Sequence, residues 1–252
     1  PSPRSIGQLA VPDRSRFLGL VKEAYDARRL SNDGPLVRAL EVRLAEYHEV
    51  KHCVAVANAG LGLMMAMQVL ARGRCGEVIM PAFSFRGLPH FACWAGQTPR
   101  FCDVDTKHHM ASVASVESQI TRDTTMILGV CNFNGCGDLA GLEQLASRYG
   151  LPLLLDSVYA VGSRYQGHPL GCHGAAEVFS LHATKLINGF EGGYITTQDD
   201  QLASMLRQQR NFCFPTSIDY PPQSFPWVLG LNAKLNEVHA ALALAALDEV
   251  DD

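Results

Sequence analysis

The sequence has 252 residues, of which 47% are hydrophobic and 18% charged, and its mean hydropathy is close to zero. This composition is typical of a soluble globular protein that is long enough to bury one large core. The 21 basic and 25 acidic residues give a net charge of −4, and the longest basic run is Arg28-Arg29, which argues against nucleic acid or a membrane surface as a partner. The N-terminus has no apolar leader and no apolar run is long enough to span a bilayer, so we expect the cytoplasm.

Neither the cysteines nor the histidines predict a metal site. The eight cysteines are scattered singly, and we expect reduced thiols in or near the core, with Cys53, Cys102 and Cys131 in or beside apolar strands. His48-Glu-Val-Lys-His52 matches the His-Glu-x-x-His pattern of zinc proteases, which requires one helix to carry both histidines. Here the helical pattern ends near His48 and a strand follows, so we predict no shared helix face and no metal.

The first part of the chain precedes the regular pattern. Residues 1–14 contain three prolines and no periodicity, which is typical of an irregular arm. Apolar residues at helical spacing predict a helix over residues 15–29 and, after a turn at 31–35, a second helix over residues 36–48.

Short apolar strands then alternate with helices. The expected strands cover residues 54–56, 77–80, 98–104, 126–130, 151–155, 177–179 and 193–197, and the expected helices cover residues 63–71, 139–149, 200–211 and 233–247, with another ending near residue 95. This pattern predicts an α/β fold with a mostly parallel mixed sheet covered by helices on both faces. Ligands bind beyond the carboxyl ends of strands in such sheets. The long irregular connection 212–229, rich in proline and aromatic residues, is of a kind that often binds ligands.

Three residues near expected strand ends carry candidate chemistry. Lys185 follows the strand 177–179, where burial can lower the pKa of an amine enough for Schiff-base chemistry, although most loop lysines are simply solvated. Asp156 ends the strand 151–155 and either caps a following helix or pairs with the protonated nitrogen of a pyridine ring. Tyr159 either packs in the core or donates a hydrogen bond to the same cofactor.

Other segments at the same predicted edge allow two interpretations each. Asn58-Ala-Gly-Leu-Gly62 is a strand-to-helix turn that presents backbone N–H groups to a phosphate, or simply packs a helix on the sheet. Ser180 can add a hydroxyl to that phosphate. Phe85 either stacks on a ring or fills the core.

The order and spacing of these segments resemble one family. From about residue 30 to its end, the chain resembles the DegT/DnrJ/EryC1/StrS aminotransferases, the sugar aminotransferases that use pyridoxal phosphate. The resemblance implies a fold-type-I large domain of a pyridoxal-phosphate-dependent transferase at residues 31–252, preceded by an arm and first helix at residues 1–30. The matching segments are Asn58-Ala-Gly-Leu-Gly-Leu63, Pro81-Ala-Phe-Ser-Phe85, Asp156-Ser-Val-Tyr159, Ser180-Leu-His-Ala-Thr-Lys185, Glu191-Gly-Gly193 and Asn232-Ala-Lys-Leu-Asn-Glu-Val-His-Ala-Ala241.

The resemblance also implies roles for single residues. Lys185 is the lysine that binds the cofactor, and Asp156 pairs with the pyridine nitrogen, with Tyr159 beside the ring. Phe85 stacks on the ring, and the phosphate is held by Gly60, Leu61 and Ser180. The family works as a homodimer with shared active sites, and the segment with Asn232 and Lys234 matches the part that reaches into the partner's site.

Three departures from the family pattern stand out. Gly60 replaces the usual threonine, which removes a phosphate-binding hydroxyl, and Tyr159 replaces the usual glutamine or histidine. The sequence stops at Asp252, inside or just after the helix that leads into the family's smaller C-terminal domain, so we expect that domain to be largely absent.

The resemblance implies an aminotransferase that moves an amino group from an amino acid, with glutamate as the expected donor, to a keto-sugar linked to a nucleotide. Lys185 argues against the family's sugar dehydratases, which have histidine at this position. Two alternatives remain open: a regulatory or partner subunit that binds pyridoxal phosphate with little activity, and a pyridoxal-phosphate enzyme that acts on a simple amino acid. We expect the loop 212–229 and His182 to shape the acceptor pocket.

Overall fold

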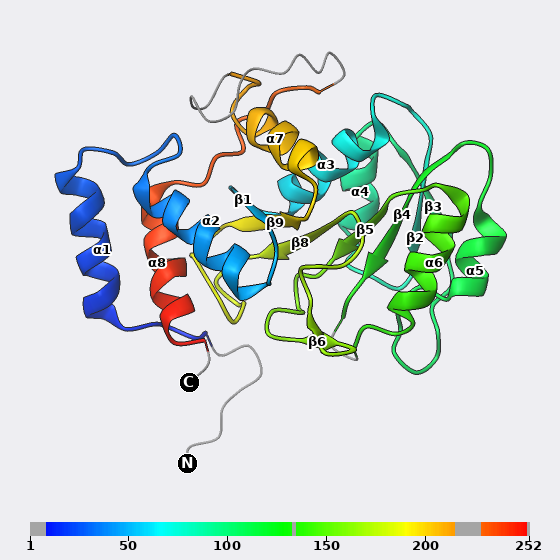
Figure 1. Ribbon diagram of the computed structural model, residues 1–252, viewed down its shortest axis with the longest axis horizontal. Coiled ribbons are helices and arrows are strands. Elements are labelled where there is room, and N and C mark those ends of the chain that lie inside the picture. Colours follow the sequence, from blue (N-terminus) through cyan, green and yellow to red (C-terminus); the bar gives the residue numbers. More distant parts are fainter. Residues whose placement is uncertain (1–8, 133–134, 215–227, 251–252) are drawn as a thin grey trace.

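In the computed structural model, residues 9–132, 135–214 and 228–250 are described, and they are built around one seven-stranded sheet (Figure 1). β9 runs antiparallel to both of its neighbours, β1 and β8, whereas the other pairings in this sheet are parallel. Across the sheet the strands are β1 (His52–Val56), β9 (Gly193–Thr197), β8 (Ala176–Ser180), β5 (Leu153–Asp156), β4 (Thr124–Val130), β2 (Glu77–Pro81) and β3 (Thr98–Cys102). A separate short hairpin consists of β6 (Arg164–Tyr165) and β7 (His168–Pro169).

Helices cover both faces of the sheet. One face carries α1 (Arg14–Asp26), α2 (Pro35–Tyr47), α5 (Val113–Gln119), α6 (Leu139–Tyr149) and α8 (Glu237–Asp248), and the other carries α3 (Ala59–Ala71), α4 (Leu88–Trp94) and α7 (Asp200–Gln209) (Figure 1). Alternate side chains of a strand point to opposite faces. In β1, Cys53 and Ala55 therefore pack with the first set of helices, and Val54 and Val56 with the second. The predicted α/β fold with a mostly parallel sheet is confirmed.

The last helix fastens the early helices to the sheet. α1 and α2 both pack against α8 (Figure 1). Gly34 precedes α2 and has no side chain that could cap it. Instead the buried carboxylate of Glu237 accepts hydrogen bonds from the N–H groups of Leu36 (2.7 Å) and Val37 (3.0 Å). A negative charge is favourable at a helix N-terminus. Residues 200 positions apart in the chain thus share one structural contact.

Local capping explains most helix boundaries. Asn58, Asp138, Asp199 and Asn236 each accept a backbone N–H in the first turn of the helix that they precede, and Gly150 ends α6 in the left-handed region at φ 62°. The predicted start of the last helix at residue 233 is wrong, because Asn236 caps α8 and residues 232 and 234 form bridges to Asn211 and Val56. The helix α5 was not predicted.

The structure resolves the histidine and cysteine patterns. α2 ends at Tyr47 and β1 begins at His52, so the two histidines do not share a helix face, as predicted. His48 is buried, with its ring nitrogens bonded to Leu170 O (2.5 Å) and the Tyr194 hydroxyl (2.9 Å), and burial lowers the pKa of His48 to about 4. All eight cysteines are free thiols; Cys53, Cys102 and Cys131 are buried, but the expectation of core or near-core positions is wrong for the exposed Cys75, Cys93 and Cys213.

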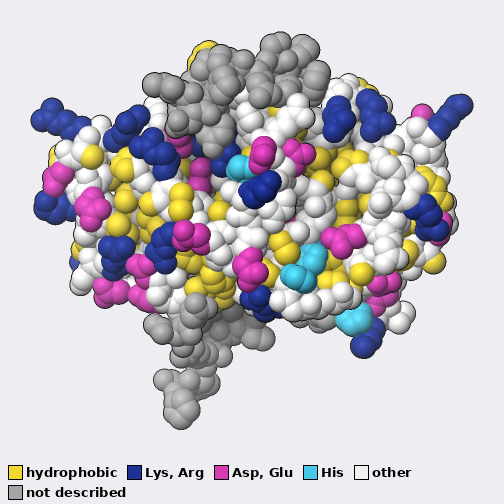
Figure 2. Space-filling model, in the orientation of Figure 1, with side chains coloured by type: hydrophobic (Ala, Val, Ile, Leu, Met, Phe, Trp, Pro, Cys, Tyr) yellow, Lys and Arg dark blue, Asp and Glu magenta, His cyan; other side chains and the backbone are white. Residues whose placement is uncertain are grey.

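On the face shown in Figure 2, acidic and basic side chains are interspersed over the elements that the structure describes. Within those elements, no helix combines the length and the apolar character that crossing a bilayer requires. Most of the loop 212–229, for which we predicted a binding role, lies outside the described residues.

Candidate active site

The predicted site segments meet at one edge of the sheet. The register pairs Val56 at the end of β1 with Gly193 at the start of β9, and Gly193 with Ser180 at the end of β8. Asp156 ends β5 beside Val178 of β8. The turn after Val56, Asp156 and Ser180 therefore lie at the carboxyl edge, where α/β sheets bind their ligands.

Asp156 is a buried carboxylate with few hydrogen-bond partners. Only 2% of its surface is exposed, and from the described residues its side chain accepts one hydrogen bond, from Val158 N–H (3.2 Å). Burial raises the pKa of Asp156 to about 6, against the opposing effects of that hydrogen bond and of the nearby Lys185 charge. A carboxylate has about four lone-pair sites. A protonated pyridine nitrogen would supply both a donor and a positive charge here, so the surroundings of Asp156 fit pyridoxal phosphate.

Lys185 and Tyr159 approach each other from two different turns. Lys185 lies in the turn after β8, where its backbone N–H donates to His182 O (2.8 Å), and Tyr159 follows β5. The Lys185 Nζ atom lies 3.4 Å from the centroid of the Tyr159 ring, a cation–π contact. The ring of the half-exposed Tyr159 thus contacts the lysine amine. The positive charge of Lys185 acts on Asp156 and lowers the pKa of that carboxylate.

The turn 58–62 begins α3 at the same edge. The Asn58 side-chain oxygen accepts a hydrogen bond from the N–H of Leu61 (2.8 Å), and the Asn58 backbone carbonyl accepts one from the N–H of Gly62 (3.1 Å). We predicted that the backbone N–H groups of Gly60 and Leu61 bind the phosphate. The Leu61 N–H already donates to the Asn58 side chain, whereas the Gly60 N–H has no acceptor among the described residues. Ser180 Oγ accepts the N–H of His182 (3.2 Å), which leaves its hydroxyl proton for an anion.

Close packing explains why glycine stands at two positions, one in this turn and one on β9 beside it. A Cβ at Gly193 would lie 2.6 Å from Ala59 N, so only glycine lets β9 approach the turn. A Cβ at Gly60 would lie 2.7 Å from Cζ of Phe91 on α4, so the Phe91 ring occupies the space that a threonine would need. Gly60, the position at which we expected the family's threonine, thus has an aromatic ring directly behind it.

The remaining predicted residues contact other side chains than Asp156, Lys185 and Ser180 among the described residues. Phe85 follows β2 and is 61% exposed, and its ring centroid lies 6.3 Å from that of Phe91. Lys234 Nζ donates to Asn232 Oδ1 (2.6 Å) and lies 4.7 Å from the centroid of the Phe212 ring. Among the described residues, these contacts of Asn232 and Lys234 therefore do not include Lys185 or Asp156. Asn232 and Lys234 lie near the end of β1, since Lys234 bridges to Val56.

Sequence reasoning missed Glu177, which lies on β8 beside the site. It is fully buried and accepts hydrogen bonds from Ser157 Oγ (2.5 Å) and from the N–H groups of Gly171 (2.5 Å) and His173 (2.9 Å). A single charged residue inside the apolar strand Ala176–Ser180 was the signal available in the sequence.

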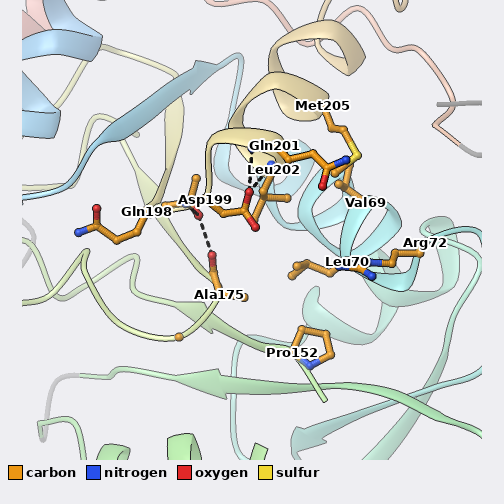
Figure 3. A pocket seen from close by; sticks show the side chains of 12 residues that line it. Val69, Leu70, Arg72, Pro152, Ala175, Gln198, Asp199, Gln201, Leu202 and Met205 are labelled. Carbon is orange, nitrogen blue, oxygen red and sulfur yellow. Dashed lines mark hydrogen bonds between the residues drawn. The ribbon is translucent and has the colours of Figure 1, made fainter. Parts of the chain in front are cut away.

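A cavity of about 400 Å³ lies at the opposite edge of the sheet (Figure 3). Pro152 precedes β5 and Ala175 precedes β8, so these lining residues mark the amino ends of the strands whose carboxyl ends carry Asp156 and Ser180. In Figure 3, Asp199 turns toward the start of α7, where its Oδ1 accepts the N–H groups of Gln201 and Leu202. This cavity is separate from the candidate active site.

Comparison with known families decides the relationship. The model of the DegT/DnrJ/EryC1/StrS aminotransferase family matches residues 13–252. The chain belongs to this family. Aminotransferases of the DegT/DnrJ/EryC1/StrS family depend on pyridoxal phosphate, which confirms the predicted cofactor.

Individual relatives agree with the family. The chain is 31% identical over 232 residues to GDP-perosamine synthase of Caulobacter vibrioides, a match that covers 92% of this chain and 62% of the relative. It is 29% identical over 252 residues to dTDP-4-amino-4,6-dideoxy-D-glucose transaminase of Shigella dysenteriae, covering 99% of this chain and 66% of the relative.

A solved structure of DesI in the presence of its TDP-sugar product superposes with a TM-score of 0.90 at 39% identity, over 100% of this chain and 62% of DesI. The predicted fold, the large domain of a fold-type-I pyridoxal-phosphate-dependent transferase, is confirmed. The chain spans about 62–66% of the length of these relatives.

Proposed function

We propose that this chain binds pyridoxal phosphate at Asp156, Lys185 and Ser180 and moves an amino group from an amino acid, with glutamate as the expected donor, to a keto-sugar carried on a nucleotide. The observation that carries the proposal is the buried Asp156, whose carboxylate has one described hydrogen-bond donor and lies near the Lys185 amine. The names of the relatives support the substrate class, because GDP-, dTDP- and TDP-linked compounds appear in them.

The chain's own residues divide the work. When bound, pyridoxal phosphate supplies an electron sink for the carbon that loses its proton. Asp156 keeps the ring nitrogen protonated, because a buried carboxylate favours a cationic partner. Lys185 would hold the cofactor, and its free Nζ would take the Cα proton of the amino donor as a general base and pass it on as a general acid rather than give it back to the same carbon. Gly60 N–H and Ser180 Oγ would hold the phosphate, with Leu61 in the same turn, and Phe85 would cover the ring.

The test is the visible absorbance of the protein after it is mixed with pyridoxal phosphate. We expect a yellow band that is lost in Lys185→Ala and kept in Lys22→Ala, because Lys22 is an exposed lysine on α1. Adding glutamate should bleach the band, and a nucleotide-linked keto-sugar should restore it. A wild-type protein that stays colourless at every cofactor concentration would overturn the proposal.

A rival function is a cofactor-binding regulatory or partner subunit with little activity. Gly60 favours it, because the turn lacks a hydroxyl and Phe91 fills that space. A yellow band that no amino acid bleaches would support this rival. An enzyme of simple amino acids would instead bleach the band and accept only small keto acids, so a survey of keto acceptors separates the remaining alternatives.

We also propose that residues 31–252 form the cofactor-binding domain of a cytoplasmic homodimer, with residues 1–30 as an arm and first helix. Asn232 and Lys234 of one subunit would then serve its partner's site, since each has other described neighbours than Lys185 within its own chain. Mixing inactive Lys185→Ala with inactive Lys234→Ala should restore part of the activity through hybrid dimers. If the mixture stays inactive although light scattering shows a dimer, the sites are not shared.

A further inference from the structure

An antiparallel bridge beside the candidate active site brings two cysteines opposite each other. Asn132 and Gly135 form an antiparallel bridge, with Gly135 N–H donating to Asn132 O (3.3 Å). Cys131 and Cys136 are the next residues outward on the two bridged segments. The position next to a hydrogen-bonded pair is a non-hydrogen-bonded pair with Cα atoms about 4.5 Å apart. This separation lies within the range of about 4.4–6.8 Å that a disulfide spans.

The two thiols also interact and differ in reactivity. The Cys131 thiol donates a hydrogen bond to the Cys136 sulfur, which lowers the pKa of Cys136. The same hydrogen bond, together with burial, raises the pKa of Cys131 well above its usual range. Cys131 is buried, whereas Cys136 is partly exposed. The accessible sulfur is therefore the one that forms a thiolate more readily, and the thiolate is the nucleophile in disulfide exchange.

We propose that Cys131 and Cys136 are a redox-active pair that closes to a disulfide on reaction with a low-molecular-weight disulfide such as oxidised glutathione. The Cys136 thiolate attacks one sulfur of the small disulfide, forms a mixed disulfide and releases one thiolate. That thiolate takes the Cys131 proton, and the Cys131 sulfur attacks Cys136 Sγ and displaces the second small thiol. Two protein thiols are oxidised, and one small disulfide is reduced to two thiols.

The pair adjoins the candidate active site without belonging to it. Cys131 follows β4, and its backbone N–H donates to the carbonyl of Asp156 (2.9 Å). A disulfide at this point would tether the two bridged segments beside the end of β5. The oxidation chemistry stands whether or not the chain is a transaminase, so its test needs no substrate or cofactor.

The 252-residue chain allows a direct measurement. It is incubated with excess oxidised glutathione, its free thiols are alkylated under denaturing conditions, and it is digested with trypsin. Cleavage after Arg122 and Arg148 releases the peptide 123–148, whose only cysteines are Cys131 and Cys136. We expect this peptide to lack both thiol hydrogens and any alkyl group, and to become doubly alkylated when dithiothreitol is added first.

Single variants test the order of attack. Cys131→Ala should retain a stable glutathione adduct on Cys136, because no second thiol can displace it, and Cys136→Ser should leave Cys131 reduced. Cys93→Ser, at an exposed position on α4, is the matched control and should form the disulfide as the wild type does. The proposal fails if wild-type peptide 123–148 stays doubly alkylated, or keeps glutathione on Cys136, under conditions that modify Cys93 and Cys213.

Discussion

Two buried carboxylates lie on neighbouring strands and have opposite surroundings. Asp156 on β5 is 2% exposed and Glu177 on β8 is 0% exposed, and Leu155 pairs with Glu177 in the register of the two strands. Glu177 accepts hydrogen bonds from Ser157, Gly171 and His173. Among the described residues, the Asp156 side chain accepts one, from Val158. Burial raises the pKa of both, but three hydrogen bonds oppose this effect at Glu177.

The difference separates an acid whose hydrogen bonds the fold supplies from the acid to which we assign a functional role in the proposed reaction. Buried polar groups are normally satisfied within the protein, so a carboxylate with three donors stabilises the fold around it. A buried carboxylate with unused lone pairs lowers the stability of the isolated protein, and it is retained where an external partner completes it. On this reasoning Glu177 anchors the turn 171–173, and we propose that the cationic ring nitrogen of the cofactor pairs with Asp156.

The largest effect should come from removing the Glu177 side chain. Glu177→Ala leaves three buried donors without an acceptor, and we expect it to lower the free energy of unfolding by about 3–5 kcal/mol. Glu177→Gln keeps an acceptor for the backbone N–H groups and a donor for Ser157, and should cost about 1 kcal/mol or less. Urea unfolding of both variants measures the difference. If Glu177→Gln is as unstable as Glu177→Ala, the negative charge of Glu177, and not its hydrogen bonds alone, stabilises the fold.

The variant Asp156→Asn should lose activity but not stability. Asp156→Asn removes the charge that pairs with the cofactor, and we expect kcat to fall by about 10²–10³, the range for losing one preorganised electrostatic partner. The cofactor-free variant should be at least as stable as the wild type, because it no longer buries a charge. Steady-state transamination and urea unfolding are measured on the same preparation. Unchanged kcat would exclude Asp156 from the reaction.

The stability of the folded protein should depend on pH through Asp156. Asp156 has a pKa of about 6 in the folded protein against an ordinary value of 3.8, so between these values the folded state holds the proton more tightly. Stability therefore falls as pH rises through this window, by up to about 3 kcal/mol for this group. His48 acts in the opposite sense, because burial lowers its pKa from 6.5 to about 4.

The two effects overlap, so the measurement is the difference between wild type and Asp156→Asn, in which His48 cancels. Thermal unfolding of the cofactor-free proteins from pH 4 to pH 7 should show the wild type losing stability relative to the variant as pH rises. A constant difference across this range would mean that Asp156 has an ordinary pKa.

The smallest effect should come from Ser157, which lies between the two acids and donates to Glu177. Ser157→Ala removes one of the three donors, and we expect a loss of about 1–2 kcal/mol in the free energy of unfolding. Its kcat should stay near the wild-type value, since the hydroxyl bonds to the structural acid. A large fall in kcat would show that the two carboxylates are coupled.

Much of the fold could be predicted from local patterns. The strand β9 and the helix α6 have the predicted bounds, because apolar periodicity and a C-terminal glycine act within a few residues. The short helix α5 was missed, since only Val116 of its seven residues is buried and its pattern is weak. The last helix starts later than predicted because its beginning is governed by bridges to residues of other segments.

Part of the candidate site could also be predicted from the sequence, and part could not. Lys185, Asp156 and the turn 58–62 could be located from their positions after apolar strands, because parallel strands bring their carboxyl ends to one edge. The contact between Lys185 and Tyr159, the Phe91 ring behind Gly60 and the isolation of Asp156 could not, because each depends on side chains that meet only after packing.

The sequence by itself determined the alternation of strands and helices, the mostly parallel direction of the strands and the residue types at the carboxyl edge of the sheet, since these follow from periodicity and chain order. Only the tertiary structure decided which buried acid is satisfied. Asp156 and Glu177 look alike in the sequence, as single charges at the end of or within apolar strands. Their hydrogen-bond donors come from turns and loops that the folded chain brings together, and that supply of donors separates the two roles.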